Sequence, residues 1–528
     1  MTAVNHKEQV LTLRDGINLS ADLWFPTDGK GSWPALLMRQ PYGKKLGSTI
    51  TYAHPSWWAS HGYLVIVQDV RGQGASEGEF TGFKQEAADT TETHQWVRSL
   101  PECNGLLGTY GFSYQGITQI LGEQGSRPPE CMAPAMTGIN EGSHWSSNGD
   151  AFWWHIGLAW GLQLAALKVS RSNNEIGWKE IRQSLETNEY LVKGVELLNK
   201  YDPKGMACQW LKNSEKGTNY FRTHNPLNSW LKQPILLIGG WWDPHLNGIL
   251  EIYHRSIKQG GQPELHIGPA THLQWWQGTN EIQLDFFNRH LKNADKKEQS
   301  QPKRILWNLT SKEWTPIEKL RGLTNTEIWS LRSTGSPCAN TEDGLLEKLS
   351  EGMGQFIIVH DPWRAVPAIG GHLSPTPGKA ERLTIDKRGD VATFTTNPFE
   401  VEKLIEGIPK LQIKAKSNNF GFDLCVALSI IYEDKEEVHQ LSIGVRRIRG
   451  TTAKEFFERE VILQPILAHF PKGSQLRISI SGALWPAIAI NPGTDNDPCG
   501  PPSYRNLITE ISMNLIESKF TINSIFSK

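Results

Sequence analysis

The sequence has few cysteines and no long apolar run. Its six cysteines are scattered over 528 residues without a Cys-x-x-Cys pair, which argues against a disulfide framework and against the usual structural zinc sites. No apolar stretch approaches the roughly 20 residues that a membrane-spanning helix requires, and the N-terminal residues lack the apolar segment of a signal peptide. We therefore expect a cytoplasmic protein with no membrane partner.

The sequence also lacks an excess of charge of either sign. It contains 54 lysines and arginines and 55 aspartates and glutamates, for a formal net charge of −1. This balance gives no electrostatic reason to expect nucleic acid as a partner. The chain is too long for one hydrophobic core, so we expect roughly two to four domains. The composition leaves the oligomeric state open, a homodimer included.

Buried strands alternate with helices in the N-terminal part. Residues 35–38, 63–68 and 106–110 form short continuous apolar runs, which are typical of strands buried on both faces of a parallel sheet. The intervening pattern predicts a helix over residues 86–98 and another over residues 117–122. Strands and crossover helices repeated in this way predict a doubly wound α/β fold.

The pattern changes twice further along the chain. Apolar residues recur at helical spacing between about 141 and 232, and buried strand runs then return at 234–238 and 264–267, followed by a helix near 283–292. After about residue 303, alternation with period two and frequent glycine, proline and asparagine predict antiparallel strands of a β-sandwich or jelly roll.

The segment Gly-Phe-Ser-Tyr-Gln-Gly at residues 111–116 falls between a predicted strand and a predicted helix. A nucleophile elbow requires this location and small neighbours, because the sharp turn leaves no room beside the serine. The spacing is one residue longer than the common G-x-S-x-G, and a serine between glycines is more often a plain turn. The flanking strand and helix favour Ser113 as a nucleophile.

A serine hydroxyl needs a histidine to remove its proton and an acid to orient that histidine. In α/β-hydrolases the acid and then the histidine follow the serine in the chain. Asp243 and His272 each follow a predicted buried strand, at the end where α/β sheets place their sites. We therefore predict a Ser113–Asp243–His272 triad.

Other assignments near the triad are open. Two other histidines could compete with His272 for the role of base. His245 shares a loop with Asp243 and could instead be a surface residue, and His266 lies within a predicted strand, where it should pack. An Asp243–His245 metal pair lacks a further ligand at a recognisable spacing. We therefore expect neither a metal nor an organic cofactor. An oxyanion hole needs fixed donors; the Tyr114 N–H is one candidate, and the Tyr42 hydroxyl is another, although simple packing is the favoured role of Tyr42 from the residues alone.

Six segments together resemble the cocaine-esterase-type (CocE/NonD) hydrolase family, which is akin to X-prolyl dipeptidyl peptidases and α-amino-acid ester hydrolases. These segments cover residues 15–22, 39–42, 68–78, 111–116, 240–243 and 268–272. The resemblance implies the triad named above, with Tyr42 and the Tyr114 N–H as oxyanion donors. Ala270 replaces a tryptophan that often precedes the family's histidine, which changes the wall of the substrate pocket.

The resemblance also implies the domain organisation. The expected segments are an α/β-hydrolase domain at 1–140 and 233–302, an inserted helical cap at 141–232 and a C-terminal jelly-roll β-sandwich at 303–528. Tryptophan outnumbers tyrosine by 21 to 11, and most of these side chains should pack the cap onto the main domain. The tryptophans we expect to line an apolar acyl pocket are Trp145, Trp153, Trp154 and Trp242.

Glu141 and Asp150, near the start of the cap, are candidates for holding a substrate ammonium group, with solvated surface carboxylates as the alternative. The favoured function is hydrolysis of a small carboxylic ester or amide through an acyl-enzyme on Ser113. An X-Pro dipeptidyl peptidase, or an α-amino-acid ester hydrolase, is the second reading. A non-catalytic protein that binds its partner through the jelly roll is a rival from another class.

Overall fold

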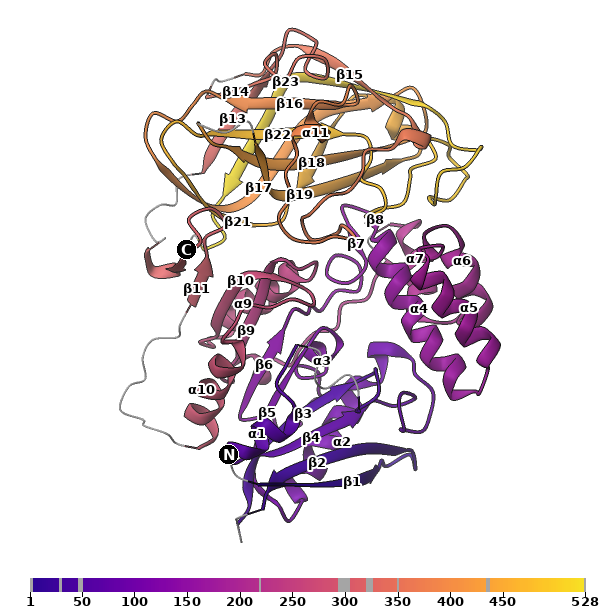
Figure 1. Ribbon diagram of the computed structural model, residues 1–528, viewed down its shortest axis with the longest axis vertical. Helices are drawn as coiled ribbons and strands as arrows, with labels where there is room; N and C mark the ends of the chain where they lie inside the picture. Colours follow the sequence, from indigo (N-terminus) through magenta and orange to yellow (C-terminus); the bar gives the residue numbers. More distant parts are fainter. Residues whose placement is uncertain are drawn as a thin grey trace.

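The computed structural model describes residues 3–27, 31–45, 51–217, 220–292, 304–319, 326–348, 351–433 and 437–526. An α/β unit is formed by the N-terminal part, helices of the central segment lie beside it, and the C-terminal part forms a β-rich unit (Figure 1). This arrangement agrees with the predicted fold class. The boundary predicted between residues 302 and 303 lies outside the described residues, and the other domain boundaries stay predictions.

Within the described residues, a ten-stranded sheet organises the α/β unit, in the order β1-β2-β4-β3-β5-β6-β9-β10-β11-β12. The strands from β4 to β11 in this order run parallel, whereas β1, β2 and β12 pair antiparallel at the edges. The strands are β1 (Val4–Thr12), β2 (Asn18–Pro26), β3 (Trp33–Gln40), β4 (Leu64–Asp69), β5 (Cys103–Phe112), β6 (Cys131–Ala135), β9 (Leu236–Trp242), β10 (Glu264–Thr271), β11 (Arg304–Trp307) and β12 (Trp314–Pro316).

Helices cover both faces of this sheet, which explains the continuous apolar runs. On one face Val65 packs in the same cluster as Trp58, and on the other Ile66 packs in the same cluster as Val97. All four side chains are fully buried, and full burial of a valine or isoleucine side chain contributes roughly 1.5–3 kcal/mol. The helices of this unit are α1 (Pro55–Ser60), α2 (Glu86–Ser99), α3 (Tyr114–Ile117), α9 (Leu246–Lys258) and α10 (Thr279–Leu291).

The helix expected over residues 117–122 is wrong. Helix α3 starts earlier and ends at Ile117. Side chains take the carbonyls that a longer helix would use: Thr118 Oγ1 donates to the Gln115 carbonyl at 3.0 Å, and Gln119 Nε2 donates to the same carbonyl at 3.1 Å. Such local bonds compete with helix propagation, so the chain leaves the helix directly after the elbow.

The central segment is helical, as predicted. Its helices are α4 (Trp154–Arg171), α5 (Glu175–Glu186), α6 (Tyr190–Tyr201), α7 (Met206–Ser214) and α8 (Asn228–Leu231). A small hairpin of β7 (Ser147–Asn148) and β8 (Ala151–Phe152) precedes them. Its turn docks on the C-terminal unit, where the Arg447 N–H donates to the Gly149 carbonyl at 2.7 Å. A Cβ at Gly149 would lie 1.8 Å from the Val445 carbonyl oxygen, so this contact requires glycine.

In the part of the C-terminal unit that the structure describes, the strands pair antiparallel except for one parallel pair, β14 with β16. β13 connects two layers, because Trp329 pairs with β23 whereas Leu331 pairs with β14. The strands are β13 (Glu327–Arg332), β14 (Leu345–Glu347), β15 (Gln355–His360), β16 (Val391–Thr396), β17 (Lys403–Ser417), β18 (Gly421–Ile431), β19 (Val438–Arg449), β20 (Phe457–Ile462), β21 (Ile466–Phe470), β22 (Gln475–Ser481) and β23 (Thr509–Asn523). The predicted β-sandwich is therefore confirmed.

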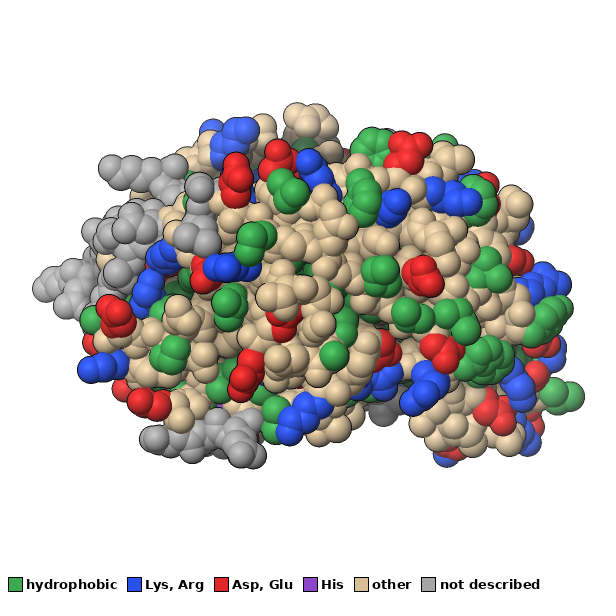
Figure 2. All heavy atoms as spheres, turned by 90° about the horizontal axis from the view of Figure 1, so that it is seen from above, with side chains coloured by type: hydrophobic (Ala, Val, Ile, Leu, Met, Phe, Trp, Pro, Cys, Tyr) green, Lys and Arg blue, Asp and Glu red, His purple; other side chains and the backbone are tan. Residues whose placement is uncertain are grey.

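Acidic and basic side chains are interspersed on the face of the C-terminal unit that Figure 2 shows. Neither sign gathers there into one continuous patch, and the hydrophobic side chains on this face are scattered. Among the described residues, no helix has both the length and the apolar character needed to cross a membrane.

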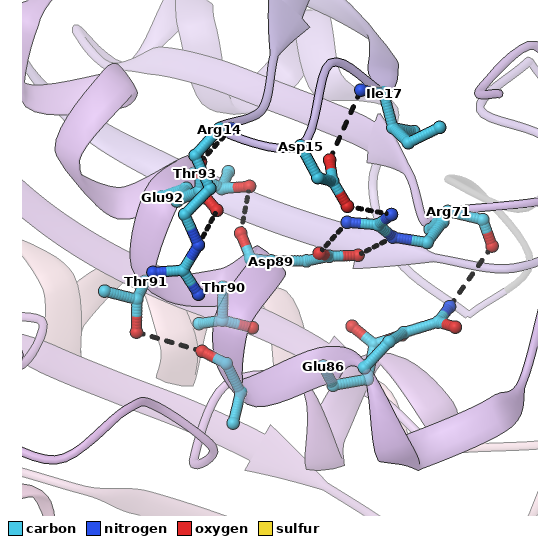
Figure 3. A network of polar contacts seen from close by, with 12 residues as sticks. Arg14, Asp15, Ile17, Arg71, Glu86, Asp89, Thr90, Thr91, Glu92 and Thr93 are labelled. Carbon is cyan, nitrogen blue, oxygen red and sulfur yellow. Dashed lines mark hydrogen bonds and ion pairs between the residues drawn. The ribbon is translucent and has the colours of Figure 1, made fainter. Parts of the chain in front are cut away.

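An ion-pair network anchors the start of α2 (Figure 3). Arg71, in the turn after β4, donates from Nε and Nη2 to Asp89 at 3.0 and 2.7 Å and from Nη1 to Asp15 at 2.6 Å. The Asp89 side chain is 1% exposed, whereas that of Asp15 is 48% exposed. Because exposed ion pairs contribute little and buried ones are costly to break, the two carboxylates should differ in their effect on stability.

We predict that Asp89→Ala lowers the free energy of unfolding by roughly 3 kcal/mol, since it removes one partner of a largely buried pair. Asp15→Ala is the matched control on the same arginine and should cost less than about 1 kcal/mol. Urea unfolding followed by tryptophan fluorescence compares the two variants. Equal losses would contradict the assignment of Asp89 as the anchoring partner.

Candidate active site

Ser113 occupies the turn between β5 and α3. Its backbone has φ 58° and ψ −127°, a conformation that residues with side chains rarely adopt and that stores strain. The Ser113 N–H donates to the carbonyls of Ala135 and Met136, at 3.0 and 3.1 Å. These bonds to the end of neighbouring β6 hold the serine in the strained turn.

The glycines at the two ends of the turn are required by close packing. Gly111 has φ 136°, and a Cβ there would lie 2.4 Å from Gln115 Cβ. A Cβ at Gly116 would lie 2.7 Å from Thr137 Cβ. The G-x-S-x-x-G spacing therefore fits this elbow, although it is one residue longer than the common form.

The structure brings Asp243 and His272 together. Each follows one of two neighbouring parallel strands, β9 and β10, so both side chains emerge at the same edge of the sheet. His272 Nδ1 lies 2.7 Å from Asp243 Oδ1. Asp243 is fully buried, whereas the His272 side chain is 27% exposed. Ser113 and His272 line one pocket, which is consistent with the predicted triad.

His245 is buried beside this pair and does not take the surface position considered above. Its Nδ1 donates to the His144 carbonyl at 2.6 Å, and its N–H donates to Asp243 Oδ2 at 3.1 Å. Burial lowers the pKa of His245 to about 4, with the charge of Asp243 opposing this effect. His245 is therefore neutral at neutral pH, and its two hydrogen bonds stabilise the turn that carries Asp243.

Asp243, His245 and His272 present ligand atoms within 4.8 Å of one another, so a metal site needs testing against the geometry. His272 Nδ1 and Asp243 Oδ1 are at hydrogen-bond distance. Asp243 Oδ2 and His245 Nδ1 already have partners in the chain. Asp243 and His272 therefore fit a hydrogen-bonded acid–base pair better than two metal ligands, which would each direct a lone pair at one ion instead of at each other.

Two donors lie near the Ser113 hydroxyl. The Tyr42 hydroxyl forms hydrogen bonds with Ser113 and with Trp160, whose Nε1 is 3.2 Å away. Burial raises the pKa of Tyr42 and these hydrogen bonds oppose the rise, so the hydroxyl keeps its proton. Tyr114 begins α3, where the first N–H groups of a helix lack partners within the helix. Both groups can therefore donate toward a negative charge beside the serine.

A buried ion pair between Arg39 and Glu86 is hydrogen-bonded to Tyr114, the residue after Ser113. The Tyr114 hydroxyl donates to Glu86 Oε1 at 2.8 Å, and Arg39 Nη1 donates to Glu86 Oε2 at 2.7 Å. Burial raises the pKa of Glu86, and the positive charge of Arg39 opposes that rise. Sequence reasoning missed this role of Glu86, since nothing distinguishes it from the other polar residues of its helix.

The pocket has a volume of about 600 Å³ and takes walls from all three parts of the chain. Among the described residues that line it, none is an aspartate or a glutamate. The apolar lining includes Trp145, Ile156, Trp160, Trp242, Leu273 and Pro375. The polar lining includes His155, Gln163, Gln274, His372, Ser374 and Thr376.

Only part of the predicted substrate lining lies in this pocket. Trp145 and Trp242 line it. Trp153 and Trp154 instead pack into the junction with the C-terminal unit. There the Trp153 backbone forms an isolated β-bridge with Ile488, and the backbone N–H of Trp154 donates to the Ala487 carbonyl at 2.8 Å. Their large apolar rings bury the surface between the two units, which corrects the prediction for this pair.

The predicted ammonium-binding carboxylates are not in the lining either. Glu141 Oε1 lies 2.7 Å from His224 Nε2, and its Oε2 accepts from Trp210 Nε1 at 2.9 Å. Asp150 pairs with Arg446 at 3.0 Å, across the junction with the C-terminal unit. Both carboxylates already have partners elsewhere, so the structure does not place them where a substrate amine would bind in this pocket.

Sequence reasoning missed two walls of the pocket. Ile156, Trp160 and Gln163 lie on one face of α4, at a spacing that a correct helix assignment would have revealed. The segment 372–377 comes from the C-terminal unit. No local signal in the sequence connects this segment with Ser113, because only the packing of the two units brings them together.

Comparisons with known proteins agree with this geometry. A family model described as X-Pro dipeptidyl-peptidase (S15 family) matches residues 15–274, and one described as X-Pro dipeptidyl-peptidase C-terminal non-catalytic domain matches residues 295–516. The cocaine esterase of Rhodococcus sp. (strain MB1 Bresler) is 24% identical over 534 aligned positions, which cover 92% of each chain.

Two solved structures show the same fold. An α-amino acid ester hydrolase matches with a TM-score of 0.74 and 18% identity, over 99% of this chain and 96% of its own. A CocE/NonD family hydrolase from Staphylococcus aureus matches with a TM-score of 0.70 and 15% identity, over 99% of this chain and 97% of its own. The predicted resemblance is confirmed: the chain belongs to the X-Pro dipeptidyl-peptidase (S15) family and is a serine hydrolase with that family's C-terminal domain.

Proposed function

We propose that the chain hydrolyses small carboxylic esters with an uncharged acyl group, through an acyl-enzyme on Ser113. The observation that carries this proposal is the pocket beside Ser113 and His272, which is largely apolar and has no carboxylate among its described lining residues. The 24% identity to a cocaine esterase over 92% of the chain supports ester hydrolysis.

In the first half of the proposed reaction, Ser113 Oγ attacks the ester carbonyl carbon and its proton passes to His272 Nε2. Asp243 Oδ1 accepts the hydrogen bond from Nδ1 and stabilises the imidazolium. The carbonyl oxygen becomes negative and accepts hydrogen bonds from the Tyr42 hydroxyl and the Tyr114 N–H. The C–O bond then breaks, and the alcohol leaves with the proton from His272.

In the second half, water attacks the acyl-enzyme carbonyl and gives a proton to His272. The tetrahedral intermediate uses the same two oxyanion donors. Collapse breaks the bond to Ser113 Oγ, which recovers a proton from His272, and the carboxylic acid leaves. These steps need no metal and no organic cofactor, because every proton moves between the substrate, water and side chains of the chain itself.

The second candidate is a dipeptidyl peptidase acting on X-Pro substrates, which the description of the matched family favours. Such a substrate carries a free ammonium group, as an α-amino ester does. Burying an ammonium without a carboxylate partner is strongly unfavourable. The described lining offers neutral groups instead, since burial lowers the pKa of both His155 and His245 to about 4. This lining favours uncharged acyl groups.

The cellular location of the protein also belongs to this proposal. The six cysteines are free thiols, which supports a reducing, cytoplasmic location. The oligomeric state, a homodimer included, and the domain boundaries stay predictions. A purely binding role would leave the strained serine and the Asp243–His272 hydrogen bond without a purpose, so we place it behind catalysis.

For the triad, we predict that Ser113→Ala and His272→Ala each lower kcat by about 10⁴- to 10⁶-fold, and that the double variant is little worse, because the residues act as one unit. Steady-state hydrolysis of a p-nitrophenyl ester measures this. Losses that multiply, or a larger loss in His245→Ala than in His272→Ala, would show that the base is misassigned.

For the oxyanion hole, Tyr42→Phe should lower kcat by roughly 10²- to 10³-fold with little change in KM, since such a donor acts mainly in the transition state. The melting temperature serves as the control for packing. An unchanged kcat together with a lowered melting temperature would mean that Tyr42 has only a structural role.

For the substrate, we predict turnover of aromatic or medium-chain p-nitrophenyl esters and weak or no turnover of Gly-Pro or Ala-Pro anilides. Matched esters that differ only by an α-amino group isolate the effect of charge, and kcat/KM should fall when the amine is protonated. Glu141→Gln and Asp150→Asn should not alter this preference. Efficient cleavage of X-Pro anilides that either variant abolishes would overturn the proposal.

A further inference from the structure

We infer that Gln464, in the C-terminal unit, is a positioning residue for the active site, because its side chain holds the turn that carries Asp243. This inference rests on the triad proposed above. It assigns a part in the reaction to a unit whose family description calls it non-catalytic.

The Gln464 amide binds the backbone on both sides of Trp242. Its Nε2 donates to the Asp243 carbonyl at 2.8 Å and to the Trp241 carbonyl at 3.2 Å. The Gln464 residue is 2% exposed, so water does not compete for these bonds. Two short bonds from one buried group restrain the end of β9 where the acid side chain emerges.

Gln464 is itself firmly anchored in the C-terminal unit, between β20 and β21. Its N–H donates to the Ile443 carbonyl at 3.1 Å. Its carbonyl accepts from Ser442 Oγ at 2.6 Å. Both partners belong to β19, which also contacts the hairpin strands β7 and β8 of the central segment. The C-terminal sheet, as well as β9, therefore fixes the position of the turn that carries Asp243.

Hydrogen bonds to both the Trp241 and the Asp243 carbonyl require a side chain with two N–H donors. Both partners are carbonyl oxygens, which only the NH₂ end of the amide can approach, so the orientation of the amide is fixed by its contacts. Gln464 Oε1 has no hydrogen-bond partner among the described residues. A methionine would fill the same space without this unpaired oxygen, but it could not donate to the two carbonyls, so packing alone does not account for glutamine here.

The restraint acts on the bond that orients the base. The Asp243 carbonyl accepts from Gln464 and also from the Leu246 N–H, at 3.3 Å, while its carboxylate accepts from His272. Without the Gln464 bond the turn gains freedom, and the carboxylate holds His272 less firmly. Imidazolium is then stabilised less, so the proton transfers slow down although substrate binding is unaffected.

The test begins with Gln464→Met, which keeps the length of the side chain and removes both donors. We expect kcat for a p-nitrophenyl ester to fall about 10- to 100-fold, the range that a small misplacement of a catalytic group causes, with KM nearly unchanged. The acidic limb of the kcat/KM profile, which reports the base of the free enzyme, should move to lower pH.

The matched control is Gln475→Met in the same unit, which removes an amide bond to the Thr396 carbonyl of 2.8 Å without contact to the acid turn. It should change neither kcat nor the pH profile. Gln464→Glu extends the test within one folded protein: an ionised carboxylate repels the two carbonyls, and a protonated one can donate a single bond. Its activity relative to wild type should therefore rise as the pH falls.

A double variant separates positioning from general stability. In an Asp243→Asn background the acid no longer stabilises the imidazolium, so adding Gln464→Met should lower kcat less than about twofold. A multiplicative loss in that background, an unshifted pH profile, or an equal effect of Gln475→Met would overturn the inference. If wild-type protein failed to hydrolyse esters at all, the proposed function would fail instead, and the two results cannot be confused.

Discussion

The hydrogen bond between His272 and Asp243 depends on two adjacent parallel strands ending at the same edge of one sheet. Parallel strands need helices on both faces, and burial on both faces is what the continuous apolar runs provide. The same edge receives the strained serine at the end of β5, two strands away from β9 in the order of the sheet. Residues up to 159 positions apart in the sequence therefore meet because of backbone pairing, before any side chain of the pocket is considered.

The two other parts of the chain decide what reaches this edge. Helix α4 and the segment 372–377 cover Ser113 and form a lining whose polar groups are amides, hydroxyls and neutral imidazoles. The two carboxylates at the start of the central segment, Glu141 and Asp150, are held by His224, Trp210 and Arg446. The C-terminal unit supplies a pocket wall and, through Gln464, a restraint on the acid turn. In the proposed mechanism, both the preference for uncharged substrates and the positioning of the acid therefore depend on more than one unit.

Much of the fold and the residues of the proposed triad could be predicted from sequence because their signals are local. Apolar runs predicted β3, β4, β5, β9 and β10, and Ser113, Asp243 and His272 directly follow three of these strands. The pocket lining could not be predicted in the same way. Trp145 and Trp153 are chemically alike, yet one lines the pocket and the other packs at the junction, because the docking of separate units decides which surface each ring meets. Gln464 carries no sequence signal at all, since its partners are backbone carbonyls more than 200 residues away.

The central claim is that an ester substrate becomes covalently attached to Ser113. Acid quenching of the enzyme during turnover of a slowly deacylating p-nitrophenyl ester, followed by peptide mass spectrometry, tests it most directly. The account predicts an increase equal to the acyl mass on the peptide that contains Ser113, and no such increase in the Ser113→Ala variant. An acyl group on a different residue, or full turnover by Ser113→Ala, would contradict it.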